Sequence, residues 1–104
     1  MPKVNRTRYD IYAEVLNVLK FYDGAGVSVI GRRANLPLDR AKEVVHFMIA
    51  RGLIVKLKNT EKRPVWIYKL TKRGFEYLEL YKKLTLFVAE ITPEELDLWD
   101  ENEF

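Results

Sequence analysis

The sequence predicts a mainly helical α+β fold, in which three helices, a small β-hairpin and a long C-terminal helix follow one another. Apolar residues recur at helical spacing in three long segments, glycines and prolines separate these segments, and two short β-branched and aromatic runs flank a polar turn. With 104 residues, 48% of them hydrophobic, the chain has enough material for one compact domain and is too short for two.

The first helix is expected over about residues 8–22. Thr7 followed by Asp10 resembles a capping box, in which two side chains accept hydrogen bonds from each other's backbone N–H groups. An apolar stripe follows at helical spacing: Ile11, Val15, Leu16, Val18, Leu19 and Tyr22. The segment Asp23-Gly24-Ala25-Gly26 then ends the helix, because its two glycines supply turn geometry at no steric cost.

Two further helices are expected to follow. Ser28 caps a short helix over about 29–34, and Pro37 fits the first turn of the next one, where its missing N–H costs nothing. This helix spans about 38–51, and Gly52 ends it as a C-cap glycine does. One face of it is apolar and is expected to be buried: Leu38, Ala41, Val44, Val45, Met48 and Ile49.

The hairpin and the last helix occupy the C-terminal half. Residues 53–57 predict a strand, 59–64 a polar turn and 65–70 the returning strand, because apolar and β-branched residues flank polar turn residues. Thr71 is then expected to cap a final long helix over 72–89.

The charges are unevenly distributed along the chain. Residues 90–104 hold seven acids and no Lys or Arg, and Thr92-Pro93-Glu94-Glu95 predicts a short helix within them. All 18 bases lie in the first 89 residues with the remaining eight acids, a net charge of +10. We therefore expect a basic N-terminal arm (1–7), a basic domain (8–89) and an acidic tail (90–104). A basic domain of this size points to nucleic acid.

The residue inventory excludes several function classes. The chain has no Cys and one His, His46, so disulfides, thiol chemistry and Cys- or His-based metal sites are excluded. It also lacks a glycine-rich phosphate loop and a carboxylate pair in a cleft, so we expect no enzyme, no metal and no cofactor.

The cellular setting follows from similar observations. No apolar run approaches the roughly 18 residues of a membrane span, and the N-terminus lacks a signal-peptide core. We expect a cytoplasmic protein without a membrane partner, nucleoid-associated if cellular or in the host cytoplasm if viral. The absence of Gln and Cys, with 32% charged residues, fits a thermophile.

Two stretches resemble the winged helix-turn-helix family. The segment from Asn35-Leu36-Pro37-Leu38 to Arg51-Gly52-Leu53-Ile54 resembles its second half, where a helix closes with a glycine and an apolar pair begins the wing. Tyr68-Lys69-Leu70-Thr71-Lys72-Arg73-Gly74 resembles the stretch that leads from the wing into the last helix. The likeness spans about residues 8–88 and is to small archaeal winged-helix proteins that dimerise through a long C-terminal helix.

The resemblance implies a DNA-binding regulator or a chromatin-like protein. Pro37 departs from the usual capping Ser, and Phe47 stands where a polar residue is usual. The acidic tail has no counterpart in the family.

The helix over 38–51 is the expected base-reading element, because the second helix of a helix-turn-helix enters the major groove. Its outer face presents Asp39, Arg40, Glu43, His46, Phe47 and Ala50. We expect Arg40 to contact guanine, Glu43 to accept from a cytosine amino group and Phe47 to contact a thymine methyl. His46, when protonated, donates to a base or a phosphate. The alternative is a solvated face, with Phe47 tucked under the N-terminal arm and His46 simply exposed.

Three basic clusters are expected to contact the DNA backbone: the N-terminal arm, the helix-turn-helix and the wing turn. Their members are Lys3, Arg6, Arg8, Arg32, Arg33, Lys42, Lys58, Lys62 and Arg63. Such contacts position a protein on DNA without specifying a sequence. The alternative is that these charges only keep the surface solvated.

The last helix carries two apolar stripes. Phe75, Leu78 and Tyr81 are expected to continue the core. The second stripe has the alternating spacing of three and four that is typical of a coiled-coil seam, and consists of Tyr77, Leu80, Leu84, Phe87 and Ile91. We expect it to pair with a second copy in a homodimer. The alternative is that the acidic tail folds back over it.

The sequence therefore predicts double-stranded DNA binding by a dimeric transcriptional regulator, with the helix over 38–51 in the major groove and the wing at 58–64 on the backbone or minor groove. A non-specific DNA-coating protein and a winged-helix protein-interaction module are the alternatives. The acidic tail is either solvated, a competitor for the DNA-binding face, or a docking segment for a basic protein partner.

Overall fold

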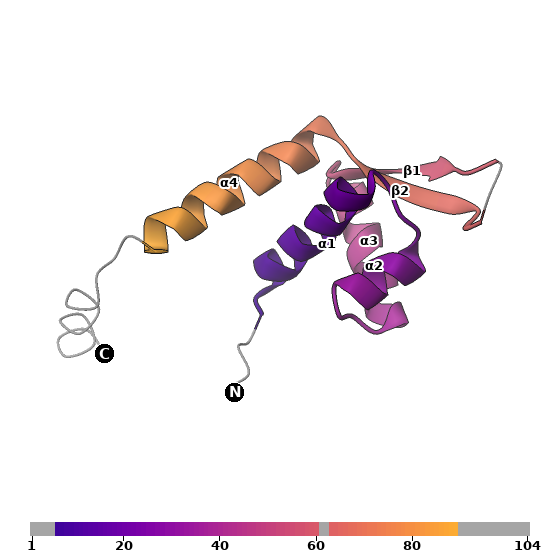
Figure 1. Ribbon diagram of the computed structural model, residues 1–104, viewed down its shortest axis with the longest axis horizontal. Helices are drawn as coiled ribbons and strands as arrows, with labels where there is room; N and C mark the ends of the chain where they lie inside the picture. The colour runs from indigo at the N-terminus through magenta and orange to yellow at the C-terminus, as the bar shows by residue number, and fades with distance from the viewer. Residues whose placement is uncertain (1–5, 61–62, 90–104) are drawn as a thin grey trace.

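The computed structural model describes residues 6–60 and 63–89, which form four helices and a two-stranded antiparallel sheet (Figure 1). The elements are α1 (Arg8–Tyr22), α2 (Val27–Arg33), α3 (Leu38–Ala50), β1 (Ile54–Lys58), β2 (Trp66–Leu70) and α4 (Lys72–Ala89). The predicted order of elements is confirmed. None of these helices is long and apolar enough to cross a membrane. The short helix expected after Thr92 lies outside the described residues.

The predicted capping box of α1 is confirmed. Thr7 Oγ1 accepts from the Asp10 N–H at 3.1 Å, and Asp10 Oδ2 accepts from the Thr7 N–H at 2.9 Å. The end of the helix differs from the prediction, because Asp23 rather than a glycine takes the first left-handed position, with φ 53°. Aspartate tolerates this conformation better than most residues, and Gly24, with φ 110°, continues the turn.

The starts of α2 and α3 correct two expectations. Gly26 is the N-cap of α2, so Ser28 lies inside the helix and does not cap it. A side chain at Gly26 would lie 2.5 Å from Pro64 Cγ, because the hairpin passes close to this turn. Pro37 is the N-cap of α3 rather than part of its first turn, and neither helix has a side-chain cap.

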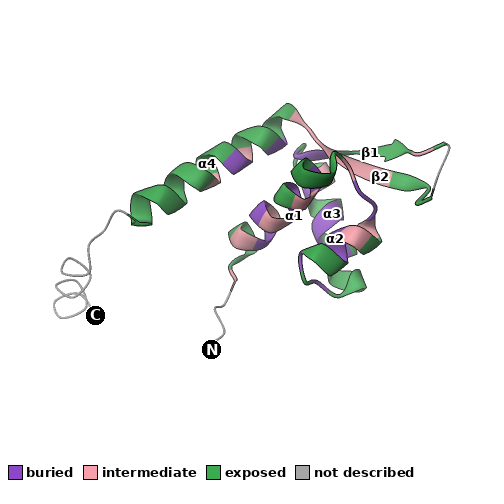
Figure 2. Ribbon diagram, viewed as in Figure 1, coloured by how far each residue is buried: buried purple, intermediate pink, exposed green. Residues whose placement is uncertain are grey.

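The core lies where α1, α2, α3 and the start of β1 face one another (Figure 2). Its largest fully buried side chains are Leu16, Leu19, Ile30, Met48, Ile54 and Val15, each contributing about 1.5–3 kcal/mol by burial. Ala41, Val44, Val45 and Met48 of α3 are buried as predicted, and Ile49 is half-buried. Leu38 is 47% exposed, so the expectation that it joins the core is wrong.

The hairpin is tied to the helices at its base. β1 and β2 pair in the register Ile54↔Leu70 to Lys58↔Trp66, and Ala25 forms a bridge with Tyr68 through hydrogen bonds of 3.2 and 2.9 Å. Thr71 Oγ1 donates to Gly52 O at 2.6 Å and accepts from the Gly74 N–H at 3.1 Å. A single hydroxyl therefore joins the end of α3, the hairpin and the predicted start of α4.

Helix α4 leaves the domain, and its outer half extends away from the other elements (Figures 1 and 2). Leu78 is buried, and Tyr81 is packed against the core as predicted. Phe75 is 47% exposed, so its expected place in the core is wrong. Tyr77 takes that place instead, with its hydroxyl donating to Tyr9 O at 2.8 Å. The helix is therefore rotated relative to the predicted stripes.

Candidate nucleic-acid interface

The outer face of α3 is exposed among the residues that the structure describes, as the sequence predicts. Its exposed residues are Asp39, Arg40, Glu43, His46, Phe47 and Ala50. The opposite face packs into the core through Ala41, Val44 and Met48. The helix is therefore held rigidly from one side while the other side is free to contact a partner.

Arg40 and Glu43 are paired with each other on this face. Arg40 Nη1 lies 3.5 Å from Glu43 Oε1, and the two side chains are 50% and 71% exposed. An exposed pair one helical turn apart contributes little stability and exchanges readily for other partners. Both side chains are therefore exposed on the outer face of α3.

Phe47 lies at the edge of α3 that faces α1. Its ring stacks on that of Tyr12, with centroids 5.0 Å apart and an interplanar angle of 14°, and the Arg51 guanidinium carbon lies 4.8 Å from the Phe47 centroid. The ring is only 37% exposed. This geometry is closer to the alternative in which Phe47 is tucked against protein, although its neighbour is α1 and not the arm. It does not favour the expected contact with a thymine methyl.

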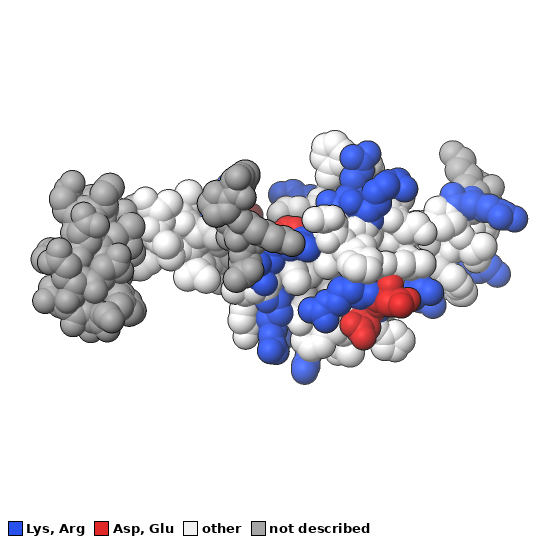
Figure 3. Space-filling model, turned by 90° about the horizontal axis from the view of Figure 1, so that it is seen from below, with Lys and Arg blue, Asp and Glu red and all other residues white. Residues whose placement is uncertain are grey.

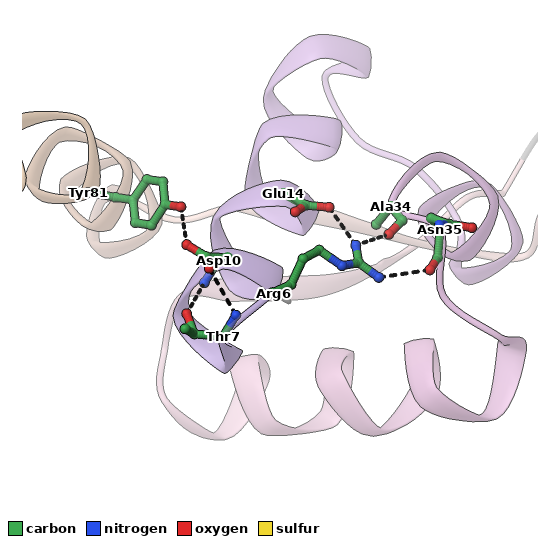
Figure 4. A network of polar contacts seen from close by, with 7 residues as sticks. All are labelled: Arg6, Thr7, Asp10, Glu14, Ala34, Asn35 and Tyr81. Atoms are coloured by element: carbon green, nitrogen blue, oxygen red, sulfur yellow. Dashed lines mark hydrogen bonds and ion pairs between the residues drawn. The ribbon is translucent and has the colours of Figure 1, made fainter. Parts of the chain in front are cut away.

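Arg6 is not part of a mobile arm, which corrects the expectation for it. Its guanidinium donates to Glu14 Oε1 at 2.6 Å, to Ala34 O at 2.6 Å and to Asn35 O at 2.9 Å (Figure 4). The bond to Glu14 ties Arg6 to α1, and the bonds to Ala34 O and Asn35 O tie it to the turn between α2 and α3. Arg6 therefore stabilises the helix-turn-helix from within and is not available to DNA phosphates.

The other expected backbone contacts that fall on described residues are exposed: Arg8, Arg32, Arg33, Lys42, Lys58 and Arg63. Lys3 and Lys62 lie outside the described residues. Seen from the side on which α2 and α3 lie, Lys and Arg side chains spread over this face with a small group of acids among them (Figure 3). The surface is therefore basic at its margins and mixed in charge where the acids lie.

Sequence reasoning did not include Lys56, which lies beside Lys42 and His46 of α3. The Lys56 Nζ lies 4.5 Å from the centroid of the Trp66 ring across the hairpin, a cation–π contact that holds the amine. Lys56 and Lys58 share one face of β1, so period-two spacing along the strand was the signal that pointed to it.

A polar network outside α3 fixes α4 against α1 (Figure 4). The Tyr81 hydroxyl donates to Asp10, whose carboxylate also takes part in the Thr7 capping box. The Tyr81 bond, followed by those from Thr7, lowers the pKa of Asp10 below 3.8, and the same bond raises the pKa of Tyr81 to about 12. Burial is the main cause that raises the pKa of Tyr77 to about 12.

The predicted seam is largely exposed. Leu80, Leu84 and Phe87 are 66%, 61% and 70% exposed, whereas Tyr77 packs on α1 and Ile91 lies outside the described residues. A shallow apolar hollow of about 210 Å³ lies beside this stripe and is lined by Tyr9, Tyr77, Leu80, Tyr81 and Leu84.

Solved structures similar to this chain include three that cover most of it. The PcaV transcriptional regulator from Streptomyces coelicolor, in complex with its natural ligand, is 24% identical, with a TM-score of 0.61 over 88% of this chain and 67% of that one. BpsR from Bordetella bronchiseptica, whose DNA binding is regulated by 6-hydroxynicotinic acid, is 16% identical, with a TM-score of 0.66 over 94% and 76%. Sso10a-2, a DNA-binding protein from Sulfolobus solfataricus, is 11% identical, with a TM-score of 0.75 over 95% and 99%.

At these identities the likeness shows a shared fold. No curated protein matches the sequence. A family model described as winged helix-turn-helix matches residues 5–88. This range includes the whole hairpin and all four helices, apart from the last residue of α4. The resemblance inferred from the two sequence stretches is confirmed, and the chain belongs to the winged helix-turn-helix family.

Proposed function

We propose that this chain is a DNA-binding transcriptional regulator that acts as a homodimer, with α3 in the major groove and the wing at 58–64 on the backbone or minor groove. The observation that carries the proposal is the exposure of the outer face of α3 among the described residues, while buried side chains anchor its inner face. A helix held in this way fits the width of the major groove and keeps its side chains in register with the bases.

The charges around α3 support DNA as the partner. Exposed basic side chains flank it on α2, at Arg32 and Arg33, and on the hairpin, at Lys58 and Arg63. These positions lie on either side of the helix along the chain, where contacts with phosphates orient a helix in the groove. The names of the structural neighbours, two of which refer to DNA binding and one to transcription, are consistent with this partner.

Two acids on α3 favour a sequence-preferring regulator over a DNA-coating protein. Asp39 and Glu43 lie one turn apart on the exposed face. A carboxylate in the major groove is repelled by phosphates unless it accepts a hydrogen bond from an amino group such as cytosine N4. Non-specific sites are therefore penalised, while Arg40 can exchange Glu43 for a guanine edge.

The dimer proposal rests on the outer half of α4. Leu80, Leu84 and Phe87 repeat at spacings of four and three and are at least 61% exposed. No described element packs over this stripe, and a coiled-coil partner buries residues at this spacing. We propose a second copy of the chain as that partner. A two-fold dimer presents two α3 helices to DNA and predicts paired half-sites.

Binding to duplex DNA at several salt concentrations tests the DNA proposal. Each neutralised phosphate contributes about −0.9 to the slope of log K against log salt, so several basic contacts predict a slope of about −3 or steeper. Selection from a random pool of duplexes then distinguishes a regulator, which enriches a symmetric motif, from a coating protein, which enriches none. A flat salt response contradicts DNA binding and leaves the protein-interaction module.

A matched pair of substitutions tests the dimer. Leu84→Glu places a charge within the stripe, and Leu86→Glu makes the same change at a 55%-exposed position two residues on, on the opposite side of α4. Sedimentation equilibrium is expected to show monomers for Leu84→Glu and dimers for Leu86→Glu. An equal mass for both variants contradicts the seam.

A further inference from the structure

A hollow of about 430 Å³ lies between α3 and the hairpin. Its lining combines residues of α3 and of both strands with the first residue of α2: Val27, Lys42, Val45, His46, Ile49, Lys56 and Tyr68. Lys42 and His46 are one turn apart on α3 and thus lie on the same side of it. Lys56 approaches from β1, where the Trp66 ring holds its amine.

Two of the titratable groups of this hollow, the lysines Lys42 and Lys56, carry positive charge, and none carries negative charge. Lys42 and His46 come from α3, Lys56 from β1 and Tyr68 from β2, and no carboxylate lines the space. Among the described residues, none of these groups belongs to an ion pair. The nearest acid before His46 on α3 is Glu43, which is paired with Arg40. Unbalanced cations gathered around one hollow attract an anion.

The position of the hollow identifies the anion. In the proposed complex α3 enters the major groove and the wing lies at the minor groove. The two grooves of duplex DNA are separated by a sugar–phosphate strand, so a protein that reaches into both must straddle a row of phosphates. The space between α3 and β1 is where that row passes.

We propose that Lys42, His46 and Lys56 form a seat for one backbone phosphate of bound DNA, and that His46 takes up a proton when the phosphate enters it. This inference rests on the proposed function and deepens it. It also assigns His46 to the backbone instead of the base edges. The lysines act as point charges, whereas protonated His46 donates an N–H to a phosphate oxygen.

The proton uptake follows from the charge of the ligand. A phosphate oxygen in contact with an imidazole favours the protonated form, so the complex binds more protons than the separate molecules do. By linkage, DNA affinity is then highest at pH values where His46 is already protonated, and it falls as the pH rises through the range in which His46 of the complex loses its proton. One charged hydrogen bond of this kind corresponds to an affinity ratio of about five- to tenfold across that range.

The test uses the full chain and one 20-base-pair duplex, with affinity measured by fluorescence anisotropy at pH 6.0 and pH 8.5 and constant salt. The wild-type chain is expected to bind about five- to tenfold more tightly at pH 6.0. His46→Gln retains an N–H donor but does not titrate, so this variant is expected to bind with the same affinity at both pH values. The contribution of the N-terminal amine is the same in both proteins and cancels in the comparison.

The lysines are tested through the salt dependence. Lys42→Gln and Lys56→Gln are each expected to make the slope of log K against log salt shallower by about 0.9. Lys82→Gln, an exposed position on α4 away from the hollow, is the matched control and is expected to leave the slope unchanged. Because His46 is the only histidine of the chain, its NMR signal follows protonation directly, and its titration midpoint is expected at higher pH in the complex.

The outcomes separate this inference from the proposed function. Steep salt dependence with an equal pH response in wild type and His46→Gln overturns the proton uptake and leaves DNA binding intact. Unchanged slopes for both lysine variants overturn the seat. A wild-type chain that binds no duplex at low salt overturns the proposed function itself.

Discussion

Replacing Gly74 with alanine tests the close packing at the base of the hairpin. Gly74 lies buried in the first turn of α4, and its N–H donates to Thr71 Oγ1 at 3.1 Å. A Cβ built on it meets the carbonyl oxygen of Leu53 well inside 3.0 Å, the limit that real Cβ atoms keep, and lies 2.8 Å from Leu70 Cδ2. The first obstacle is backbone, so rotation of a side chain cannot remove the clash.

The expected size of the effect combines two opposing contributions. Alanine is a better helix former than glycine by about 1 kcal/mol, which by itself would stabilise α4. Overpacking against a well-ordered neighbour costs about 1–3 kcal/mol, and more where backbone must move. We therefore expect Gly74→Ala to lower the free energy of unfolding by about 1–2 kcal/mol, which corresponds to a fall in Tm of about 5–15 °C for a domain of this size.

Gly31→Ala provides the matched control, because it is the other glycine inside a helix of the described chain. Its Cβ would lie 3.0 Å from Leu36 O and 3.4 Å from Ala41 Cβ, so small adjustments relieve the contact. In thermal unfolding monitored by circular dichroism, wild type and Gly31→Ala are both expected to have a higher Tm than Gly74→Ala. A Gly74→Ala variant that melts at or above the wild-type temperature, or a larger loss for Gly31→Ala, refutes the steric reasoning.

Three further substitutions test the interface and the α1–α4 contact. Arg40→Ala is expected to relax base preference at one position of a selected site, at a cost of about 1–3 kcal/mol, and loss of affinity on all sequences alike would contradict a base contact. Lys58→Ala is expected to weaken binding uniformly across sequences, which competition with unrelated duplexes measures; a sequence-selective loss would contradict its place on the backbone. Because the Tyr81 hydroxyl holds the pKa of Asp10 below its usual range, the carboxylate stabilises the fold above the ordinary pKa of an aspartate and loses that effect as the pH falls through its lowered pKa. Tyr81→Phe is expected to reduce this acid sensitivity in melts between pH 2 and 5, and an unchanged pH profile would show that the hydroxyl has no part in it.

The ends of the elements were predictable where a side chain or glycine fixes them locally. Thr7 with Asp10, Gly52 and Thr71 each act through hydrogen bonds to residues close in sequence or through a left-handed backbone, with φ 73° at Gly52. The start of α2 was not predictable in this way. Gly26 caps this helix without a side chain, and the space for a side chain there is taken by Pro64, a residue far away in the sequence.

The rotation of α4 shows why spacing alone misassigned two aromatic residues. The alternating spacing of three and four residues assigns Tyr77 to the exposed stripe and Phe75 to the core. The close approach of Gly74 to Leu53 and the bond from Tyr77 to Tyr9 O turn the helix the other way. The partners in these contacts are the backbone oxygens of Leu53 and Tyr9, which the residues of α4 do not identify.

The part of the candidate site that could be predicted is the exposed face of α3, because α3 is an amphipathic helix. The exposure of α3 follows from the apolar spacing of its inner face. The role of Arg6 does not, because its acceptors include the backbone carbonyls of Ala34 and Asn35, which any residue would offer. Likewise, the stacking of Phe47 on Tyr12 requires knowing how α1 crosses α3.

The closure of the hairpin at its base by Thr71 separates the tip from the stability of the domain. The Thr71 hydroxyl bridges Gly52 and Gly74, and the Ala25–Tyr68 bridge holds the returning strand, so these links between the hairpin and the helices lie at its base and do not depend on the tip. Loop closure depends only weakly on length, and insertions are tolerated best at exposed tips. The tip can therefore be lengthened, shortened or recharged across evolution, or by a protein engineer, to change its reach along a partner while the rest of the domain melts as before.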